Sequence, residues 1–134
     1  MIDVAVNTLI VYGTRYGATA GTSQEIAKVL LAEDFDVRVL NLKEEKIRHI
    51  SEYELVIVGS GMQMGKWTSE ADNFLKIFSK ELQRNKHAIF ASTMKTVSER
   101  EGKQDDVAAM RKAALDDKVA QYGLHPIAMD SLAA

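Results

Sequence analysis

Cysteine is absent from this 134-residue chain, and the other residues that support special chemistry are scarce. Without cysteine there are no disulfides, no thiol catalysis and no thiolate-bound zinc or iron–sulfur site. The histidines His49, His87 and His125 are far apart in the sequence, so we expect no metal site. We identify no catalytic triad and no general acid or base, and therefore assign no catalytic residue.

The chain also lacks a large net charge and long apolar runs. Seventeen basic and nineteen acidic side chains leave a charge of −2, so no strong field attracts nucleic acid. No apolar run approaches the roughly 18 residues of a transmembrane helix, and no signal-peptide pattern opens the chain. We therefore expect one cytoplasmic domain over residues 1–134, with no nucleic-acid partner and no integral membrane segment.

Short apolar segments alternate with helical patterns along the chain. Strands are predicted at residues 8–12, 36–42, 54–61, 87–93 and 127–129. Helices are predicted up to about residue 33, from residue 69, and over about residues 105–122, where Gly123 ends the last one. Their inward side chains are predicted to be Phe74, Leu75, Ile77, Phe78 and Leu82 in the second helix, and Val107, Met110, Ala114, Leu115 and Val119 in the third. This alternation predicts an α/β fold with a doubly wound parallel sheet.

The segment between the first strand and the first helix is rich in glycine and threonine. Gly13 and Gly17 allow close approach of the backbone, and Thr14 and Thr19 place hydroxyls near the free N–H groups of a helix N-terminus. Neither GxxxxGK[ST] nor GxGxxG is present, which disfavours a nucleoside triphosphate or a dinucleotide. The segment therefore predicts a site for a phosphate monoester held mostly by neutral donors.

Hydroxyl-bearing residues also follow the third and fourth predicted strands. Ser60 and Gly61 end the third strand, and Ser92 and Thr93 end the fourth. In doubly wound sheets the ligand lies beyond the carboxyl ends of the strands, where the strand order reverses. We therefore expect the segments after the first, third and fourth strands to form one crevice.

The segments YGTRYGATAGTSQEIAKVL and YELVIVGSGMQMGKW resemble the flavodoxin-like family. They are most similar to the branch that includes the menaquinone-dependent protoporphyrinogen oxidases. The resemblance covers nearly the whole chain, and it implies a five-stranded sheet of order 2-1-3-4-5 with FMN as cofactor. It also implies that the FMN phosphate is wrapped by Thr14, Arg15, Tyr16, Gly17, Ala18 and Thr19. Tyr16 stands where the family motif T-x-T-G-x-T has its middle threonine.

Residues 60–67 resemble the family segment that lies against the isoalloxazine ring. The resemblance implies ring contacts from Ser60, Gly61, Met62, Gly65 and Trp67. The indole of Trp67 offers a large π surface for stacking, and the alternative is that it anchors the next helix at the edge of the core. Met62 is expected to pack against neighbouring apolar side chains.

The segment before the first helix departs from the family pattern. Residues 20–23 resemble a short insertion before the helix, so Thr22 or Ser23 is a further candidate for a phosphate contact. The alternative for this region is an ordinary connection in which Thr22 and Glu25 form a capping box and no ligand binds.

The segment after the fourth strand also departs from the pattern. Ser92 and Thr93 are its implied cofactor contacts, but no glycine or aromatic residue follows them within residues 92–96, so one flavin face is expected to be open. Arg15 and Lys66 lie near the expected site, and a nearby cation favours the anionic reduced flavin. We therefore expect a less negative potential than that of a strongly acidic flavodoxin.

The function expected from these features is electron transfer through FMN, with a redox protein, a quinone or another organic substrate as partner. One alternative is an FMN-dependent, quinone-linked protoporphyrinogen oxidase. Another is a flavin-free interaction module or phospho-receiver of the same fold. A receiver needs acidic residues after the first and third strands, where this chain has Gly13 and Ser60.

The end of the chain is short for this fold. Only residues 130–134 follow the fifth predicted strand, whereas the resemblance implies a final helix over one face of the sheet. We expect this helix to be missing, which would leave an apolar face exposed to water. The chain is therefore expected to form a homo-oligomer or to be part of a longer chain.

Overall fold

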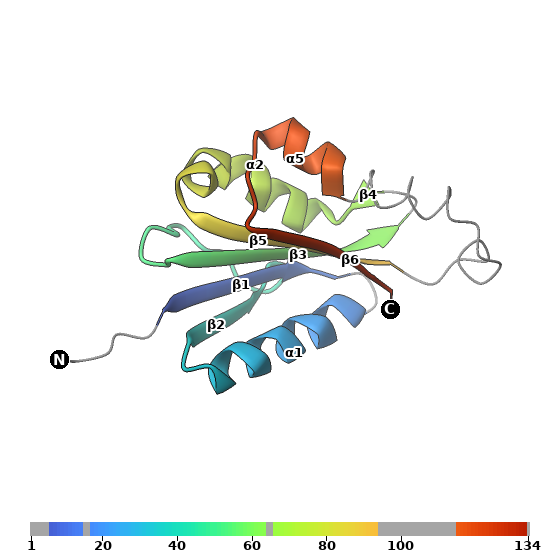
Figure 1. The fold of residues 1–134 in the computed structure, drawn as a ribbon. Coiled ribbons are helices and arrows are strands. Elements are labelled where there is room, and N and C mark those ends of the chain that lie inside the picture. Colours follow the sequence, from blue (N-terminus) through green and yellow to red (C-terminus); the bar gives the residue numbers. More distant parts are fainter. Residues whose placement is uncertain (1–5, 15–16, 64–65, 94–114, 134) are drawn as a thin grey trace.

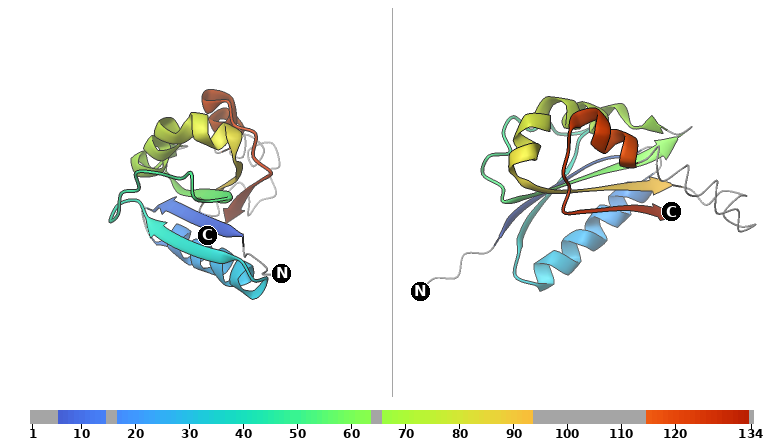
Figure 2. Two further views of the ribbon diagram at one scale, coloured as in Figure 1. Left: turned by 90° about the vertical axis from the view of Figure 1, so that its left-hand side faces the viewer. Right: turned by 45° about the horizontal axis from the view of Figure 1, so that its top comes forward.

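The computed structural model describes residues 6–14, 17–63, 66–93 and 115–133. A twisted sheet lies between helix α1 on one face and helices α2 and α5 on the other (Figure 1, Figure 2). The strands are β1 (Asn7–Gly13), β2 (Asp36–Asn41), β3 (Leu55–Gln63), β4 (Lys66–Trp67), β5 (Lys86–Thr93) and β6 (Ala128–Ala133). The helices are α1 (Ala18–Ala32), α2 (Ser69–Arg84) and α5 (Asp117–Tyr122).

The strand order confirms the predicted sheet. The order is β2-β1-β3-β5-β6, and all of these neighbours are parallel. The fourth and fifth predicted strands are therefore β5 and β6. The prediction for residues 127–129 was too short, because β6 starts at Ala128 and extends to Ala133. Strand β4 was not predicted; it pairs antiparallel with β3, with Met62 opposite Trp67.

The central strands are buried on both faces, as their continuous apolar sequence predicts. Leu9, Ile10 and Val11 of β1 are fully buried, and so are Val56 and Val58 of β3. Alternate residues of a strand point to opposite faces. A strand without polar alternation therefore has to be covered on both sides, and here α1 covers one side and α2 the other.

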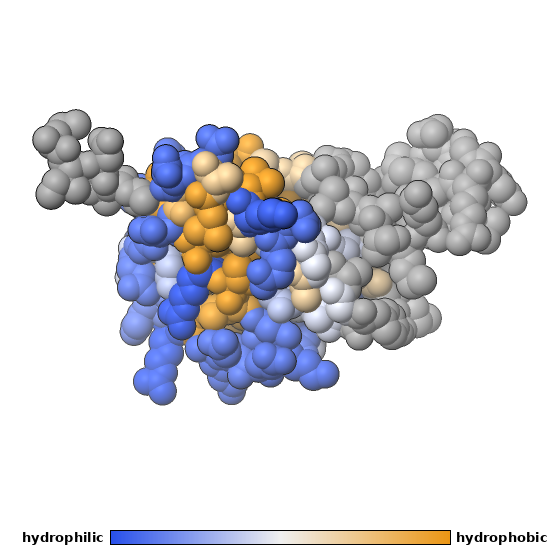
Figure 3. Space-filling view, turned by 90° about the horizontal axis from the view of Figure 1, so that it is seen from below, coloured by the Kyte–Doolittle hydropathy of each residue, from blue (hydrophilic) through white to orange (hydrophobic). Residues whose placement is uncertain are grey.

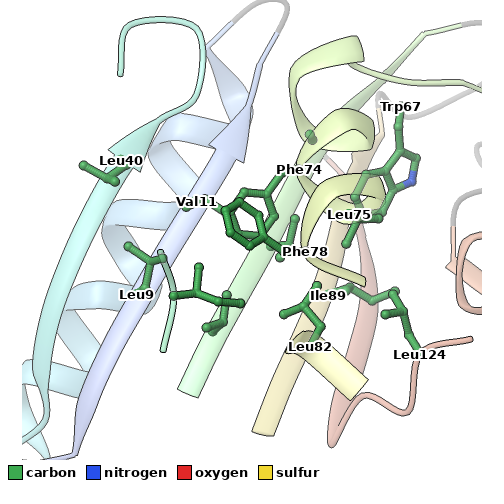
Figure 4. Packing of buried hydrophobic residues seen from close by; sticks show 14 of the residues in the cluster. Leu9, Val11, Leu40, Trp67, Phe74, Leu75, Phe78, Leu82, Ile89 and Leu124 are labelled. Atoms are coloured by element: carbon green, nitrogen blue, oxygen red, sulfur yellow. The ribbon is translucent and has the colours of Figure 1, made fainter. Parts of the chain in front are cut away.

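The larger core lies between the sheet and α2 (Figure 4). The helix contributes Ala71, Phe74, Leu75, Phe78 and Leu82. The rings of Phe74 and Phe78 pack with their centroids 4.7 Å apart. The prediction that Ile77 faces inward was wrong, because its side chain is 71% exposed. Ile77 lies just beyond the arc of the helix that the buried residues occupy.

Helix α5 is fixed to α2 by a small polar cluster. Asp72 Oδ1 accepts a 2.6 Å contact from Lys118 Nζ and a 2.8 Å hydrogen bond from the Tyr122 hydroxyl. Burial of the phenol, together with this bond to Asp72, raises the pKa of Tyr122 to about 12. Gly123 ends the helix with a positive φ of 63°, as predicted.

The predicted inner side of this last helix is confirmed where the structure describes it. Leu115 is fully buried, and Val119 packs against the core. Val107, Met110 and Ala114 lie outside the described residues.

A smaller core lies between the sheet and α1. Ile10, Ala27, Ile57 and Phe90 are buried there. Around this core the surface stays apolar, because Val29 and Leu31 of α1 are 62% and 56% exposed. Figure 3 shows this apolar patch, bordered by hydrophilic residues, on the α1 side of the molecule. In the part of the chain that the structure describes, α1 is the only helix on this face.

Gly59 is required by the packing of this smaller core. A Cβ added to Gly59 would overlap the ring of Phe90. We expect Gly59→Ala to lower the free energy of unfolding by about 1–3 kcal/mol, the usual cost of overpacking. Chemical denaturation measures this change.

Gly21 is the matched control, because it lies within α1 and an added Cβ meets no atom within 4 Å. Gly21→Ala should raise the free energy of unfolding by about 0.5–1 kcal/mol, since alanine favours the helix. Equal stability of Gly59→Ala and the wild type would contradict the packing described for Phe90.

Candidate functional site

The carboxyl ends of β1, β3 and β5 lie side by side at one edge of the sheet. Gly13 of β1 is in register with Ser60 of β3, and Ser60 is in register with Ala91 of β5. One position further on, Gly61 is opposite Ser92. The residues that the sequence singled out after these strands therefore meet at one edge, as expected for a doubly wound sheet.

The first segment at this edge turns directly into α1. Gly17 has a left-handed φ of 88° and donates its N–H to Thr14 Oγ1 at 2.8 Å. Among the described residues, no side chain caps the first turn of α1, so the N–H groups of this turn have no side-chain acceptor there. Because the Thr14 hydroxyl accepts the bond from Gly17, its own proton remains available for a ligand.

The helix begins earlier than the sequence suggested. Residues 20–23 lie within α1, so they are not an insertion before it. Thr22 is likewise inside the helix, and the capping box with Glu25 is wrong because Gly17 is the N-cap residue. Ser23 Oγ donates to the carbonyl oxygen of Thr19 at 2.8 Å inside the fold, which occupies its hydroxyl proton.

Thr19 presents a buried hydroxyl near the start of α1. Its side chain is 1% exposed, and its Oγ1 has no partner among the described residues. Thr19, Ser23 and Ala27 are spaced four residues apart and therefore share one side of α1. Since Ala27 packs on the smaller core, Thr19 faces the sheet at the N-terminal end of the helix.

Ser92 is the second buried hydroxyl without a partner among the described residues. It is 5% exposed, and it follows Phe90 by two positions in β5, so both side chains point to the α1 face. The hydroxyls of Thr19 and Ser92 therefore belong to the same face and the same edge of the sheet. A buried hydroxyl left unpaired costs about 1–3 kcal/mol, so this pair favours a polar ligand at this place.

Ser60 has a different role from the one expected. It is fully buried, and its Oγ donates to the carbonyl oxygen of Gly61 at 2.8 Å and accepts from the N–H of Thr68 at 2.9 Å. Alternation along β3 turns Ser60 toward the α2 face, away from Thr19 and Ser92. Its hydroxyl is thus used within the fold, and a contact between the backbone of Ser60 and the cofactor stays a prediction.

The structure favours the second of the two roles expected for Trp67, which is packing in the core and not stacking on a flavin. Its side chain is 4% exposed and belongs to the larger core, on the α2 face of the sheet (Figure 4). A ring that is buried among core side chains has no free face for a flavin. Met62 is partly buried against the same core, in agreement with its expected packing. Gly61 lies within β3 and not in a loop.

Other expected site residues are not described in full. Arg15, Tyr16 and Gly65 lie outside the described residues. Ala18 is the first residue of α1 and Thr93 the last of β5, so both backbones lie at the carboxyl edge.

Thr68 is a structural residue of the site that sequence reasoning missed. Thr68 is the N-cap of α2 and accepts from the N–H of Ala71 at 3.3 Å. The signal was present as a threonine just before a helix whose first turn carries Glu70 and Asp72, a common helix start. The contact of Thr68 with Gly13 depends on tertiary structure and has no sequence signal.

Two surface grooves lie away from this edge. One of about 310 Å³ lies between residues 42–47 and α2, and one of about 350 Å³ lies along α1. The groove along α1 includes Thr22, which the sequence offered as a candidate phosphate contact, and the other groove contains no residue that the sequence assigned to a cofactor. Among the described residues, no three metal-binding side chains come together. None of the described helices is long and apolar enough to cross a membrane.

Solved structures with the same fold are similar to this chain at low sequence identity. The two-electron reduced flavodoxin of Megasphaera elsdenii matches with a TM-score of 0.67 and 18% identity, over 93% of this chain and 85% of that one. A flavodoxin of Fusobacterium nucleatum bound to flavin mononucleotide matches with a TM-score of 0.62 and 19% identity, over 90% and 68%.

A larger protein contains a similar unit. The rubredoxin oxygen:oxidoreductase of the anaerobe Desulfovibrio gigas matches with a TM-score of 0.69 and 16% identity, over 96% of this chain. This chain spans only 31% of the length of that protein.

Sequence comparison extends the likeness beyond the fold. No curated protein matches this chain. The family model described as a flavodoxin domain matches residues 9–126, which is most of the chain. The matched region includes residues 9–13 of β1, all of α1, the carboxyl ends of β1, β3 and β5, and α5. The chain therefore belongs to the flavodoxin domain family.

Proposed function

We propose that this protein binds FMN at the carboxyl edge of its sheet and transfers electrons through it. The observation that carries the proposal is the pair of buried hydroxyls at that edge, Thr19 Oγ1 and Ser92 Oγ, which have no partner among the described residues. They lie next to the uncapped N-terminus of α1, which attracts a phosphate. Family membership and the flavin mononucleotide (FMN) bound to the similar flavodoxin of Fusobacterium nucleatum support the same ligand.

The phosphate is assigned to the start of α1. The Thr14 hydroxyl is oriented by Gly17 and can donate to a phosphate oxygen, and Thr19 Oγ1 can donate from the first turn. Backbone N–H groups of this turn complete the set, and the helix dipole favours the dianion. Arg15, Tyr16 and Ala18 belong to the same proposed phosphate segment.

The ring is assigned to the ends of β3 and β5. Ser92 faces the α1 side there, and its neighbour Gly61 has no side chain that would keep a ring from the backbone. Thr93 and Gly65 are assigned to the same ring side. When bound, FMN supplies the redox chemistry, and the protein supplies binding, orientation and electrostatics.

The charge near the site bears on the choice of partner. Lys66 is exposed at the start of β4, close to the carboxyl end of β3. A cation there stabilises an anionic reduced flavin and raises the potential. We assign a redox protein as partner, in the cytoplasm. The resemblance to the protoporphyrinogen oxidase branch would instead imply a quinone or another organic substrate as partner. Reoxidation of the reduced flavin by a soluble quinone would favour this second kind of partner over a redox protein.

The hydroxyls should contribute measurably to FMN affinity. We expect Thr14→Ala and Thr19→Val each to weaken FMN binding by about 1–3 kcal/mol, because each loses a hydrogen bond to a charged group. Riboflavin, which has no phosphate, should bind these variants and the wild type equally. Titration followed by flavin absorbance or fluorescence measures both ligands.

The stability of the ligand-free protein separates binding from folding in this experiment. Thr19→Val removes an unpaired buried hydroxyl, so it should not lower the free energy of unfolding. Ser79→Ala removes an exposed hydroxyl of α2 and serves as the control for both measurements. Equal affinity of the wild type for FMN and riboflavin would refute the phosphate site.

The proposal includes association of this chain with a second copy through the α1 surface. Val29 and Leu31 are exposed there, and Val29 lines an apolar groove together with Ile26 and Leu30. Burial of apolar surface stabilises by about 25 cal/mol per Å². In a solution of the purified chain, another copy offers the matching apolar surface that can cover this one.

We expect sedimentation of the purified chain at micromolar concentration to show a dimer or larger species. Val29→Glu should shift this species toward the monomer, because it places a charge in the apolar surface. Ile77→Glu is the matched control: Ile77 is 71% exposed but lies on α2, on the opposite face. A monodisperse wild-type monomer would contradict this part of the proposal.

A further inference from the structure

The end of β1 is packed against the start of α2 without spare room. A Cβ added to Gly13 would overlap Thr68 Oγ1, and it would lie 3.1 Å from Thr68 Cβ and 3.3 Å from the Ala71 nitrogen. Gly13 is the last residue of β1 and directly precedes Thr14. The backbone that leads into the proposed phosphate segment therefore packs directly against the side chain of Thr68.

The hydroxyl of Thr68 is in turn held by Ser60. Ser60 Oγ donates to the carbonyl oxygen of Gly61 at 2.8 Å, which uses its only proton. The 3.2 Å contact between the two hydroxyls is thus donated by Thr68, and Ser60 also accepts from the Thr68 N–H at 2.9 Å. Thr68 Oγ1 accepts from the N–H of Ala71 at 3.3 Å. Thr68 and Ser60 are 2% and 0% exposed, so water does not compete for these bonds.

This arrangement exceeds what capping of a helix requires. The bond from the Ala71 N–H to Thr68 Oγ1 is sufficient as an N-cap. The two further bonds to Ser60 tie Thr68 to β3, and the close approach of Gly13 ties it to β1. Gly13 and Ser60 are also in register as neighbours in the sheet. A shift of Thr68 therefore has to move both strand ends.

We propose that Ser60 and Thr68 are positioning residues that couple the phosphate side of the site to its ring side. The phosphate side is the end of β1 with the start of α1, and the ring side is the ends of β3 and β5 together with β4, which pairs with β3. This inference rests on the proposed function for the identity of the ligand, but the coupling itself is a property of the free protein. Loss of the Ser60 hydroxyl loosens both sides, although Ser60 belongs only to β3.

Amide hydrogen exchange of the ligand-free protein tests the coupling without flavin. In Ser60→Ala the Thr68 N–H loses its buried acceptor, while the bond from Ala71 to Thr68 is retained. We expect faster exchange not only at Gly61 and Thr68 but also at Thr14 and Gly17, compared with the wild type. Ser79→Ala, which removes an exposed hydroxyl of α2, should leave all of these rates unchanged.

Two variants of Thr68 keep the test decisive if Ser60→Ala fails to fold. Thr68→Val retains the shape and loses the hydroxyl, so it should reproduce the faster exchange on both sides. Thr68→Ser retains the hydroxyl and should behave like the wild type. Faster exchange confined to β3, β4 and α2, with Thr14 and Gly17 unchanged, would overturn the inference.

Flavin binding gives the second readout. We expect Ser60→Ala to weaken riboflavin binding about two- to tenfold, the range of one neutral hydrogen bond. The ratio of FMN to riboflavin affinity should also fall, because the phosphate side is loosened as well. An unchanged ratio with weaker binding of both ligands would show a local effect on the ring side and contradict the coupling. If the wild type binds neither flavin, the proposed function fails, while the exchange rates still decide the coupling.

Discussion

The parallel register of β1, β3 and β5 is the constraint on which the site depends. Because Gly13, Ser60 and Ala91 are aligned across these strands, the carboxyl ends of the three strands lie at the same edge of the sheet. The register is maintained by strands that are apolar on both sides and buried under α1 and α2. A slip of one residue would turn every buried side chain to the other face. The core thus determines which hydroxyls meet at the edge.

Alternation along the strands gives two similar serines opposite roles. Ser60 points to the α2 face and is used in hydrogen bonds within the fold, whereas Ser92 points to the α1 face and has no partner among the described residues. Both were assigned to the cofactor from sequence, since both follow a buried strand. The two serines differ in the face they occupy: Ser92 follows Phe90 by two positions and shares its α1 face, whereas Ser60 lies on the α2 face. The face of a residue, and not its type, decides its role here.

Much of the fold could be predicted from sequence because its determinants are local. The apolar strands and the glycine after the last helix were identified from spacing and composition. Features that depend on tertiary contacts were missed: β4 has only two residues and exists through its pairing with Met62 and Gln63. Trp67 is buried because that hairpin brings it against α2. Ile77 fits the helical spacing, yet the sheet leaves its side of α2 uncovered.

The most direct test of the account is the phosphorus NMR signal of FMN in the presence of the protein. The phosphate of free FMN loses its second proton at a pH of about 6. At the N-terminus of α1, the dianion should be favoured by the N–H groups and by Thr14 and Thr19. We therefore predict a shifted resonance that does not change between about pH 5 and pH 8. A resonance that titrates near pH 6 as in free FMN would show that the phosphate is not held there.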